Sequence, residues 1–171
     1  MKAAVAAGLD PEAVTPFLLL KHTAQRPGDV LRMTWADYTP GAPGHIRVRQ
    51  EKTKKLLDVP VHPELAARLD AMWRGRSPYI INSRGRPVSY RRFNDRFRRV
   101  CAAADIDAQA RDLRRTAMVN MALAGATVPM IASVSGHSID ATTRILETYL
   151  PRNTKLGDAA IIQLAAFQAR R

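Results

Sequence analysis

The sequence has a single cysteine and few acidic residues, and both shortages limit what the protein can be. Cys101 is the only cysteine in 171 residues, which excludes an internal disulfide and any metal site built from several cysteines. Such sparse cysteine usage fits the reducing cytoplasm. The 15 Asp and Glu residues are outnumbered by 27 Lys and Arg residues, so the formal net charge is +12. This excess of positive charge predicts a polyanionic partner, most often nucleic acid.

The sequence also lacks segments of the kind that enter or cross a membrane. The uncharged stretch 119–136 contains Gly125 and Pro129, so it predicts two buried helices and not a membrane span. The Ala-rich run near the N-terminus is too short for a signal peptide, because Asp10-Pro11-Glu12 ends it. A basic chain could bind an anionic membrane surface, but no long helix pairs a basic face with a broad aromatic or leucine face. We therefore expect no membrane partner.

Apolar residues make up 46% of the chain, which is enough for the core of one domain. Their spacing predicts a mainly helical α+β fold with one small antiparallel sheet. The sheet is expected at 45–49, where apolar and polar residues alternate, and at 56–61, which returns as the partner strand after a basic turn. Helices are expected through 17–20 and at 29–33, 63–73, 89–104, 112–124, 127–135, 140–149 and 158–169, with Ser89, Thr127 and Asp140 among the N-caps.

One short stretch, 110–117, concentrates arginine at the start of an expected helix. Asp112 is a suitable N-cap, and apolar residues recur after it at helical spacing. Arg111, Arg114 and Arg115 are neighbours near the helix N-terminus, which already favours anions. Their guanidinium groups predict a site for a strongly anionic group, with phosphate the natural candidate. The alternative is an ordinary solvated basic face.

Five short motifs follow one another along the chain at characteristic spacings. They are Ala24-Gln25-Arg26 leading through Asp29 to Trp35-Ala36-Asp37, then Lys52-Thr53, Arg111-Asp112-Leu113-Arg114-Arg115-Thr116, Gly136-His137 and Glu147-Thr148-Tyr149. Together they resemble the motifs of the tyrosine recombinases, the phage integrase family, over roughly 11–152. The resemblance implies that family's mainly helical catalytic domain, in which one small antiparallel sheet carries the lysine, a fold similar to type IB topoisomerases.

The chain departs from the family pattern in two places. Arg111 occupies the position of the first histidine in the H-x-x-R box, and the interval from His137 to Tyr149 is about one helical turn longer than usual. The family also implies a helical DNA-clamping domain before the catalytic one. We expect a catalytic domain at 1–152 and a tail helix at 153–171, with the clamping domain absent.

The resemblance implies site-specific DNA recombination, as in integration or excision. DNA strands would be cut and rejoined through a 3′-phosphotyrosine, with a 5′-hydroxyl as the leaving group and without a metal or cofactor. Tyr149 would be the nucleophile, Arg26 and Arg114 the phosphate clamp, Lys52 the general acid, and His137 a phosphate contact or the base for the tyrosine. Arg111 cannot act as a base near neutral pH, so it would add a phosphate contact.

Double-stranded DNA and other recombinase protomers, assembled as a tetramer on DNA, are the implied partners. Further basic residues are expected to contact the DNA backbone: Lys54, Lys55, Arg91, Arg92, Arg96 and Arg115. The three remaining histidines, His22, His45 and His62, are expected to be incidental.

Two other functions and one structural question stay open in the sequence. The chain could be a DNA-binding relic or regulator of integrase origin without turnover, or it could relax DNA as type IB topoisomerases do. The tail helix 158–169 is too apolar to remain in water, so we expect it to dock, either on its own domain or on a neighbouring protomer.

Overall fold

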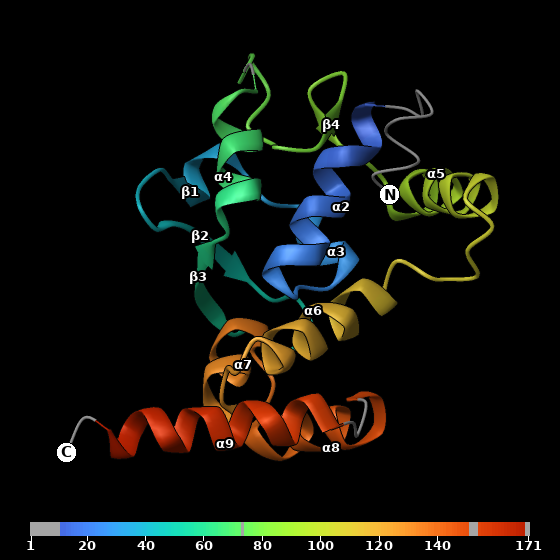
Figure 1. The fold of residues 1–171 in the computed structure, drawn as a ribbon. Coiled ribbons are helices and arrows are strands. Elements are labelled where there is room, and N and C mark those ends of the chain that lie inside the picture. Colours follow the sequence, from blue (N-terminus) through green and yellow to red (C-terminus); the bar gives the residue numbers. More distant parts are fainter. Residues whose placement is uncertain (1–10, 73, 151–153, 170–171) are drawn as a thin grey trace.

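The computed structural model describes residues 11–72, 74–150 and 154–169. Figure 1 shows two layers: α2, α3, α4 and the sheet lie above α6, α7 and α8. The upper layer comprises α2 (Pro11–Thr23), α3 (Pro27–Val30), a 3-10 turn (Trp35–Asp37), β1 (Tyr38–Thr39), β2 (Gly44–Arg49), β3 (Leu56–Val61) and α4 (Pro63–Asp70). A two-stranded ladder, β4 (Asn82–Ser83) and β5 (Arg86–Pro87), leads to α5 (Tyr90–Ala103). The lower layer comprises α6 (Asp112–Leu123), α7 (Val128–Ser135) and α8 (Ile139–Tyr149), and α9 (Thr154–Gln168) follows.

The sheet forms where alternation predicts it. Strands β2 and β3 are antiparallel with Ile46 opposite Val59 and Arg49 opposite Leu56, and β1 adds a short third strand. Ile46 and Val59 are buried, whereas Arg47 on the other face is exposed. The α+β fold class is therefore confirmed, with the expected sheet and an additional two-residue ladder at β4–β5.

Two apolar clusters hold the layers. The larger one joins α2, α4, the sheet and α5, with Leu19, Leu20 and Leu65 fully buried. The smaller one lies in the lower layer around Met118 and Ile131 and reaches the end of α2. Each fully buried Leu or Met side chain contributes roughly 1.5–3 kcal/mol relative to an exposed one. The segment that follows α2 runs from the larger apolar cluster to the smaller one. The candidate functional side chains lie where the two clusters meet.

Most helix ends follow the sequence, but the short helix expected at 29–33 spans Pro27–Val30, and two expected N-caps are wrong. Thr127 caps α7 and Gly136 ends it with a φ of 74°, as predicted. Helix α8 is capped by Ser138, whose hydroxyl accepts the Ala141 N–H, because that residue has the extended backbone of an N-cap. Asp112 is likewise not a cap: it lies inside α6, and its carboxylate turns back to accept the Gln109 N–H at 2.9 Å.

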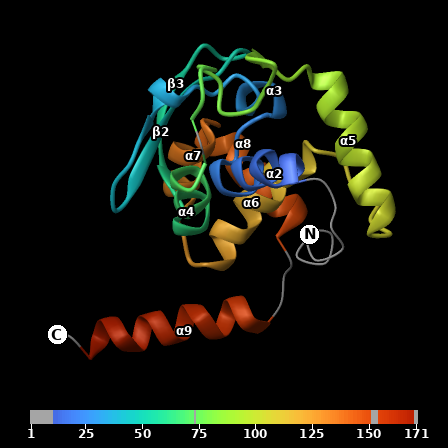
Figure 2. The ribbon, with the colours of Figure 1, turned by 90° about the horizontal axis from the view of Figure 1, so that it is seen from above.

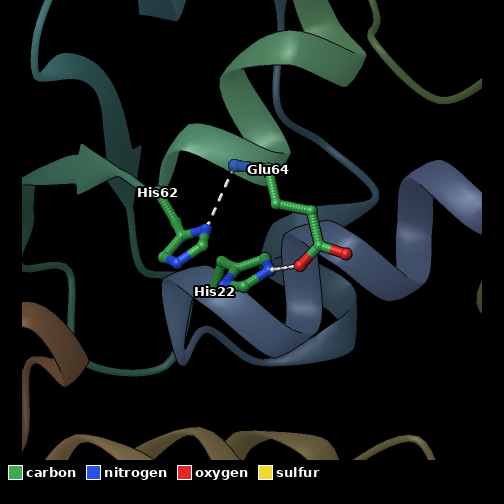
Figure 3. A group of neighbouring side chains, drawn as sticks. All are labelled: His22, His62 and Glu64. Atoms are coloured by element: carbon green, nitrogen blue, oxygen red, sulfur yellow. Dashed lines mark hydrogen bonds and ion pairs between the residues drawn. The ribbon is translucent and has the colours of Figure 1, made fainter. Parts of the chain in front are cut away.

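The carboxylate of Glu64, at the start of α4, binds side chains at the end of α2 (Figure 3). Glu64 Oε2 accepts a hydrogen bond from Lys21 Nζ at 2.6 Å. It also accepts one from the His22 ring at 2.7 Å, which Figure 3 shows. The His62 ring stacks on His22 at a centroid distance of 4.1 Å, and its Nδ1 accepts the Glu64 N–H at 3.1 Å, which caps α4. Hydrogen bonds from Lys21 and then His22 lower the pKa of Glu64 to about 2.

The same three side chains, His22, His62 and Glu64, offer ligand atoms within 4.8 Å of one another, so they form a possible cation site. Their geometry opposes that use. The Lys21 ammonium already occupies the carboxylate, and two parallel stacked rings do not aim their lone pairs at one point. Two of the three histidines expected to be incidental, His22 and His62, thus have a structural role here.

Helix α9 begins at Thr154, earlier than expected, and its described side chains from Gly157 onward are exposed. Figure 2 shows it standing apart from the layered body. Ile161 and Ile162 are 66% and 68% exposed. An apolar surface of α9 is therefore exposed in the part of the chain that the structure describes. No helix in the described part of the chain combines the length and apolar character needed to cross a membrane.

Candidate active site

One open cavity of about 650 Å³ lies at the junction of the two layers. The structure brings all six residues expected to be catalytic to its walls, although they are far apart in the sequence: Arg26, Lys52, Arg111, Arg114, His137 and Tyr149. The other lining residues are Pro27, Arg115, Met118, Arg144, Ile145 and Thr148. The cavity is thus strongly basic and has a tyrosine in its wall.

Arg26 enters the cavity where the chain turns from α2 into α3. Ala24 takes a left-handed backbone with a φ of 53°, and Arg26 itself is extended at the N-cap of α3. Its Nη1 lies 3.9 Å from Asp29 Oδ2, and Nη1 is buried with no hydrogen-bond partner among the described residues. Asp29 also accepts the Glu51 N–H at 2.9 Å. The same carboxylate therefore orients Arg26 and anchors the β2–β3 turn.

Arg114 is the most deeply placed of the cavity cations, with 7% of its surface exposed. Its Nη2 donates to the Ser135 carbonyl at 2.8 Å and lies 3.2 Å from the His137 ring nitrogens. Its Nη1 is buried without a hydrogen-bond partner in the described structure. Burial, followed by the charge of Arg26, lowers the pKa of Arg114 to about 10. Arg114 is therefore still charged at neutral pH and has an unused N–H group at the cavity.

His137 follows Gly136 directly after α7. Its Nδ1 lies 3.1 Å from Ser135 Oγ. Burial lowers the pKa of His137 to about 4, and the charges of Arg114, Arg26 and Lys55 act in the same direction. The ring is therefore neutral near pH 7 and has an unprotonated nitrogen, and the surrounding positive charges favour this neutral form.

Lys52 is exposed on the turn between β2 and β3. The turn is held at both ends, because the Glu51 N–H donates to Asp29 and Lys55 Nζ donates to the Gly136 carbonyl at 3.1 Å. Lys54, between them, is exposed and has a φ of 57°. A long cationic side chain thus reaches the cavity from a surface turn anchored to its buried side.

Tyr149 is the last residue of α8 and is 46% exposed. The Arg115 guanidinium lies 5.1 Å from the centre of its ring, and Arg115 Nη1 also contacts Asp112 Oδ1 at 3.1 Å. Arg115, expected to bind the DNA backbone, therefore also contacts the expected nucleophile.

The other residues expected to contact DNA are spread more widely. Arg91 and Arg92 are exposed on α5 and do not line the cavity. Arg96 is half-buried and lies in the wall of a separate apolar cavity with Phe93 and Phe97. Its role in DNA binding, like that of Arg91 and Arg92, stays a prediction.

Arg144 is a cavity residue that the motifs do not contain. Arg144, Ile145, Thr148 and Tyr149 lie on one face of α8, and Thr148 Oγ1 donates to the Arg144 carbonyl at 2.8 Å. Helical spacing backward from Tyr149 is the signal that could have identified it. Asp29, Gln25 and Gln50 were missed as supporting residues, because their contacts join segments far apart in the sequence.

Comparisons with known proteins agree with this architecture. The phage integrase family model matches residues 5–150. Among solved structures, XerA recombinase superposes with a TM-score of 0.71 at 19% identity, over 94% of this chain and 59% of that one. XerH recombinase in a post-cleavage complex gives 0.69 at 14%, over 88% and 45%, and a DNA-bound dimer of lambda integrase residues 75–356 gives 0.67 at 21%, over 83% and 54%. The chain thus spans about half the length of these proteins. No curated protein matches the sequence.

Proposed function

Since the chain belongs to the phage integrase family, we propose that it cuts and rejoins DNA at specific sites through a covalent bond to Tyr149. The observation that carries this proposal is the convergence of Tyr149, basic side chains and the neutral His137 on one cavity. Related structures support it by what they contain. XerH was solved with its difH substrate, lambda integrase as a tetramer on a Holliday junction, and the Tn1549 integrase with transposon end DNA.

Arg26 and Arg114 would bind the scissile phosphate. Both line the cavity, and each has a buried Nη1 without a hydrogen-bond partner among the described residues. Attack on phosphorus spreads negative charge over the non-bridging oxygens, and fixed guanidinium donors stabilise that charge. The positive charges of these two arginines would thus neutralise the negative charge of the phosphate.

The bond changes balance within the cavity. The Tyr149 oxygen forms a bond to phosphorus while the bond from phosphorus to the 5′-oxygen breaks. The phenol proton passes to the neutral His137, and Lys52 gives a proton to the departing 5′-oxygen. Rejoining reverses these transfers, so the covalent intermediate conserves the phosphodiester bond energy.

Arg111 supports a second candidate function. It stands where the family has a histidine, is exposed at the cavity, and cannot exchange a proton near neutral pH. In the leading proposal it adds a phosphate contact and His137 remains the proton acceptor. In the alternative, the chain binds DNA without turnover as a regulator or relic.

A trapping experiment separates these candidates. The full chain is incubated with nicked duplexes of randomised sequence, in which cleavage releases a short fragment and prevents rejoining. Covalent adducts are then isolated under denaturing conditions and sequenced. The leading proposal requires an adduct that forms with wild type and with Tyr90→Phe, an exposed tyrosine of α5, but not with Tyr149→Phe. DNA binding without any adduct would establish the alternative.

Further protomers are proposed as partners through α9. Its exposed Ile161, Ile162 and Leu164 form an apolar surface that a neighbouring protomer on DNA could cover. A chain ended after Arg152 should still form adducts as single protomers but lose multimeric complexes in native gels. Unchanged multimers would exclude this role.

A further inference from the structure

Two buried glutamines lie behind the cavity without lining it. Gln25 and Gln50 are both 0% exposed, although glutamine is usually found at protein surfaces. Gln50 Nε2 donates to Gln25 Oε1 at 2.7 Å. The pair joins the end of α2 to the end of β2, two segments well separated in the sequence.

The hydrogen bonds of this pair are complete. Gln50 Nε2 also donates to the Ser135 carbonyl at 2.9 Å, and its Oε1 accepts from the Thr53 hydroxyl at 2.6 Å. Gln25 Nε2 donates to the carbonyls of Thr23 at 2.9 Å and Val134 at 2.8 Å. Every amide N–H of the two side chains is used, so only one relative orientation satisfies the whole set.

Each of these bonds ends at a residue that is close in the sequence to one of the cavity residues. Gln25 directly precedes Arg26, and Thr53 directly follows Lys52. The Ser135 carbonyl accepts from Gln50 and, at the same time, from Arg114 Nη2. His137 lies two residues beyond that carbonyl. The amide pair therefore connects the four segments that supply the phosphate clamp, the general acid and the base.

The packing is close at Gly136, where α7 meets Gln50. A Cβ atom added to Gly136 would lie 2.6 Å from Gln50 Nε2, and the φ of 74° there already disfavours a side chain. Stability alone does not require such a pair, because apolar groups of the same shape can replace buried hydrogen-bonded partners at little cost. Hydrogen bonds between two glutamine side chains are directional, so they fix the relative positions of the segments that carry them, whereas the contacts of a leucine side chain do not.

We propose that Gln25 and Gln50 are positioning residues that set Lys52 against Arg26, Arg114 and His137. This inference rests on the proposed function, and neither glutamine contacts the reacting atoms. The pair acts through Thr53 and the Ser135 carbonyl, so its loss displaces the general acid from the clamp. A misplacement of about 1 Å in such a group can cost about 10²-fold in rate.

The test compares Gln50→Leu, Gln25→Leu and the double variant on two versions of a trapped duplex. One carries the natural 5′-oxygen at the scissile phosphate and the other a 5′-bridging sulfur, which leaves without a proton. We expect each variant to cleave the oxygen duplex about 10²-fold more slowly and the sulfur duplex nearly as fast as wild type. The double variant should be no slower than either single variant, because the pair acts as a unit.

Thr15→Val is the matched control, because it also removes a buried hydrogen-bonding group, here the acceptor of Arg68 Nε, away from the cavity. Equal losses on both duplexes, or cleavage by the Leu variants as fast as by this control, would overturn the inference. Amide hydrogen exchange in DNA-free protein gives an independent readout. Faster exchange confined to 51–55 and 135–138 supports the inference, and unchanged or global exchange overturns it. Absence of any adduct with wild type would refute the proposed function alone, since the exchange readout still decides the role of the pair.

Discussion

The two sides of the cavity hold their functional groups very differently. On one side Arg114 is 7% exposed and, with His137, is bonded to the end of α7. On the other side Lys52 lies on an exposed turn, and Tyr149 is 46% exposed at the end of α8. Groups proposed to bind the phosphate are thus fixed before DNA arrives, whereas those proposed to form or release a bond remain accessible. In the proposed reaction, the most rigidly held groups are those that would face the developing negative charge.

Removing the buried arginine should have the largest effect. Arg114→Ala should lower the rate of covalent adduct formation by about 10²–10³-fold, because it removes a fixed donor to the transition state. Arg86→Ala, an exposed arginine of β5, is the control and should leave the rate unchanged. Single-turnover adduct formation is the measurement. Equal rates for both variants would show that the buried side of the cavity does not bind the phosphate.

Removing the exposed lysine should lower the cleavage rate by a smaller factor, and a better leaving group in the DNA should restore that rate. Lys52→Ala should slow cleavage of the natural duplex by about 10²-fold, the lower end for general acid catalysis. A 5′-bridging sulfur should restore most of that rate, because the leaving group no longer needs a proton. Arg47→Ala, exposed on β2, serves as the control. A loss that sulfur does not repair would place Lys52 with the phosphate-binding groups instead.

Lowering the pH should reduce the stability of the protein through His137, on the buried side of the cavity. Burial holds the pKa of His137 at about 4 in the folded state, below its ordinary value of 6.5. The stability that neutral His137 contributes is therefore present above pH 6.5 and declines as pH falls from there toward 4. His137→Asn should flatten the dependence of Tm on pH in that window, whereas His45→Asn should not. Identical pH profiles for wild type and His137→Asn would contradict the assignment.

The smallest effect should come from the ion pair far from the cavity. Glu64→Gln removes a partly exposed carboxylate that Lys21 and His22 share, so it should cost roughly 0.5 kcal/mol and less at high salt. The pKa of Glu64 is about 2 in the folded state, below the ordinary value of 4.5 for a glutamate. The stability from this ion pair is therefore lost as the pH falls from 4.5 toward 2. Thermal unfolding measures the change, and cleavage should be unaffected. A change in cleavage rate would mean that the α2–α4 junction communicates with the cavity.

Local sequence patterns predicted much of the fold. The alternation at 45–49 identified β2, the return of the chain at 56–61 after a basic turn identified β3, and Thr127 with Gly136 marked both ends of α7. Such signals depend on residues close in the chain. Where candidates compete within a few residues, as Ser138 and Asp140 do for α8, side-chain type alone did not select the cap. The two-residue strands β4 and β5 are too short to show any periodicity.

The motifs identified which residues meet in the cavity but not what supports them. Arg26, Lys52 and Tyr149 could be selected because each lies in a recognisable phrase. Gln25 and Gln50 could not, since their significance depends on a contact between distant segments and on complete burial. Arg144 lies outside every motif, although it shares a helix face with Tyr149.

Gly136 has a consequence for how mutational tolerance is interpreted. Its φ of 74° and the close approach of Gln50 leave no room for a side chain. Every substitution should therefore disturb the packing of Gly136 against the glutamine pair behind the cavity. A saturation scan scored by recombination would then rank this position beside Arg114 and Tyr149. Yet Gly136 has no functional group to donate, accept or attack. In this protein, intolerance to substitution would mark the residues that the reaction depends on, which is a larger set than the residues that react.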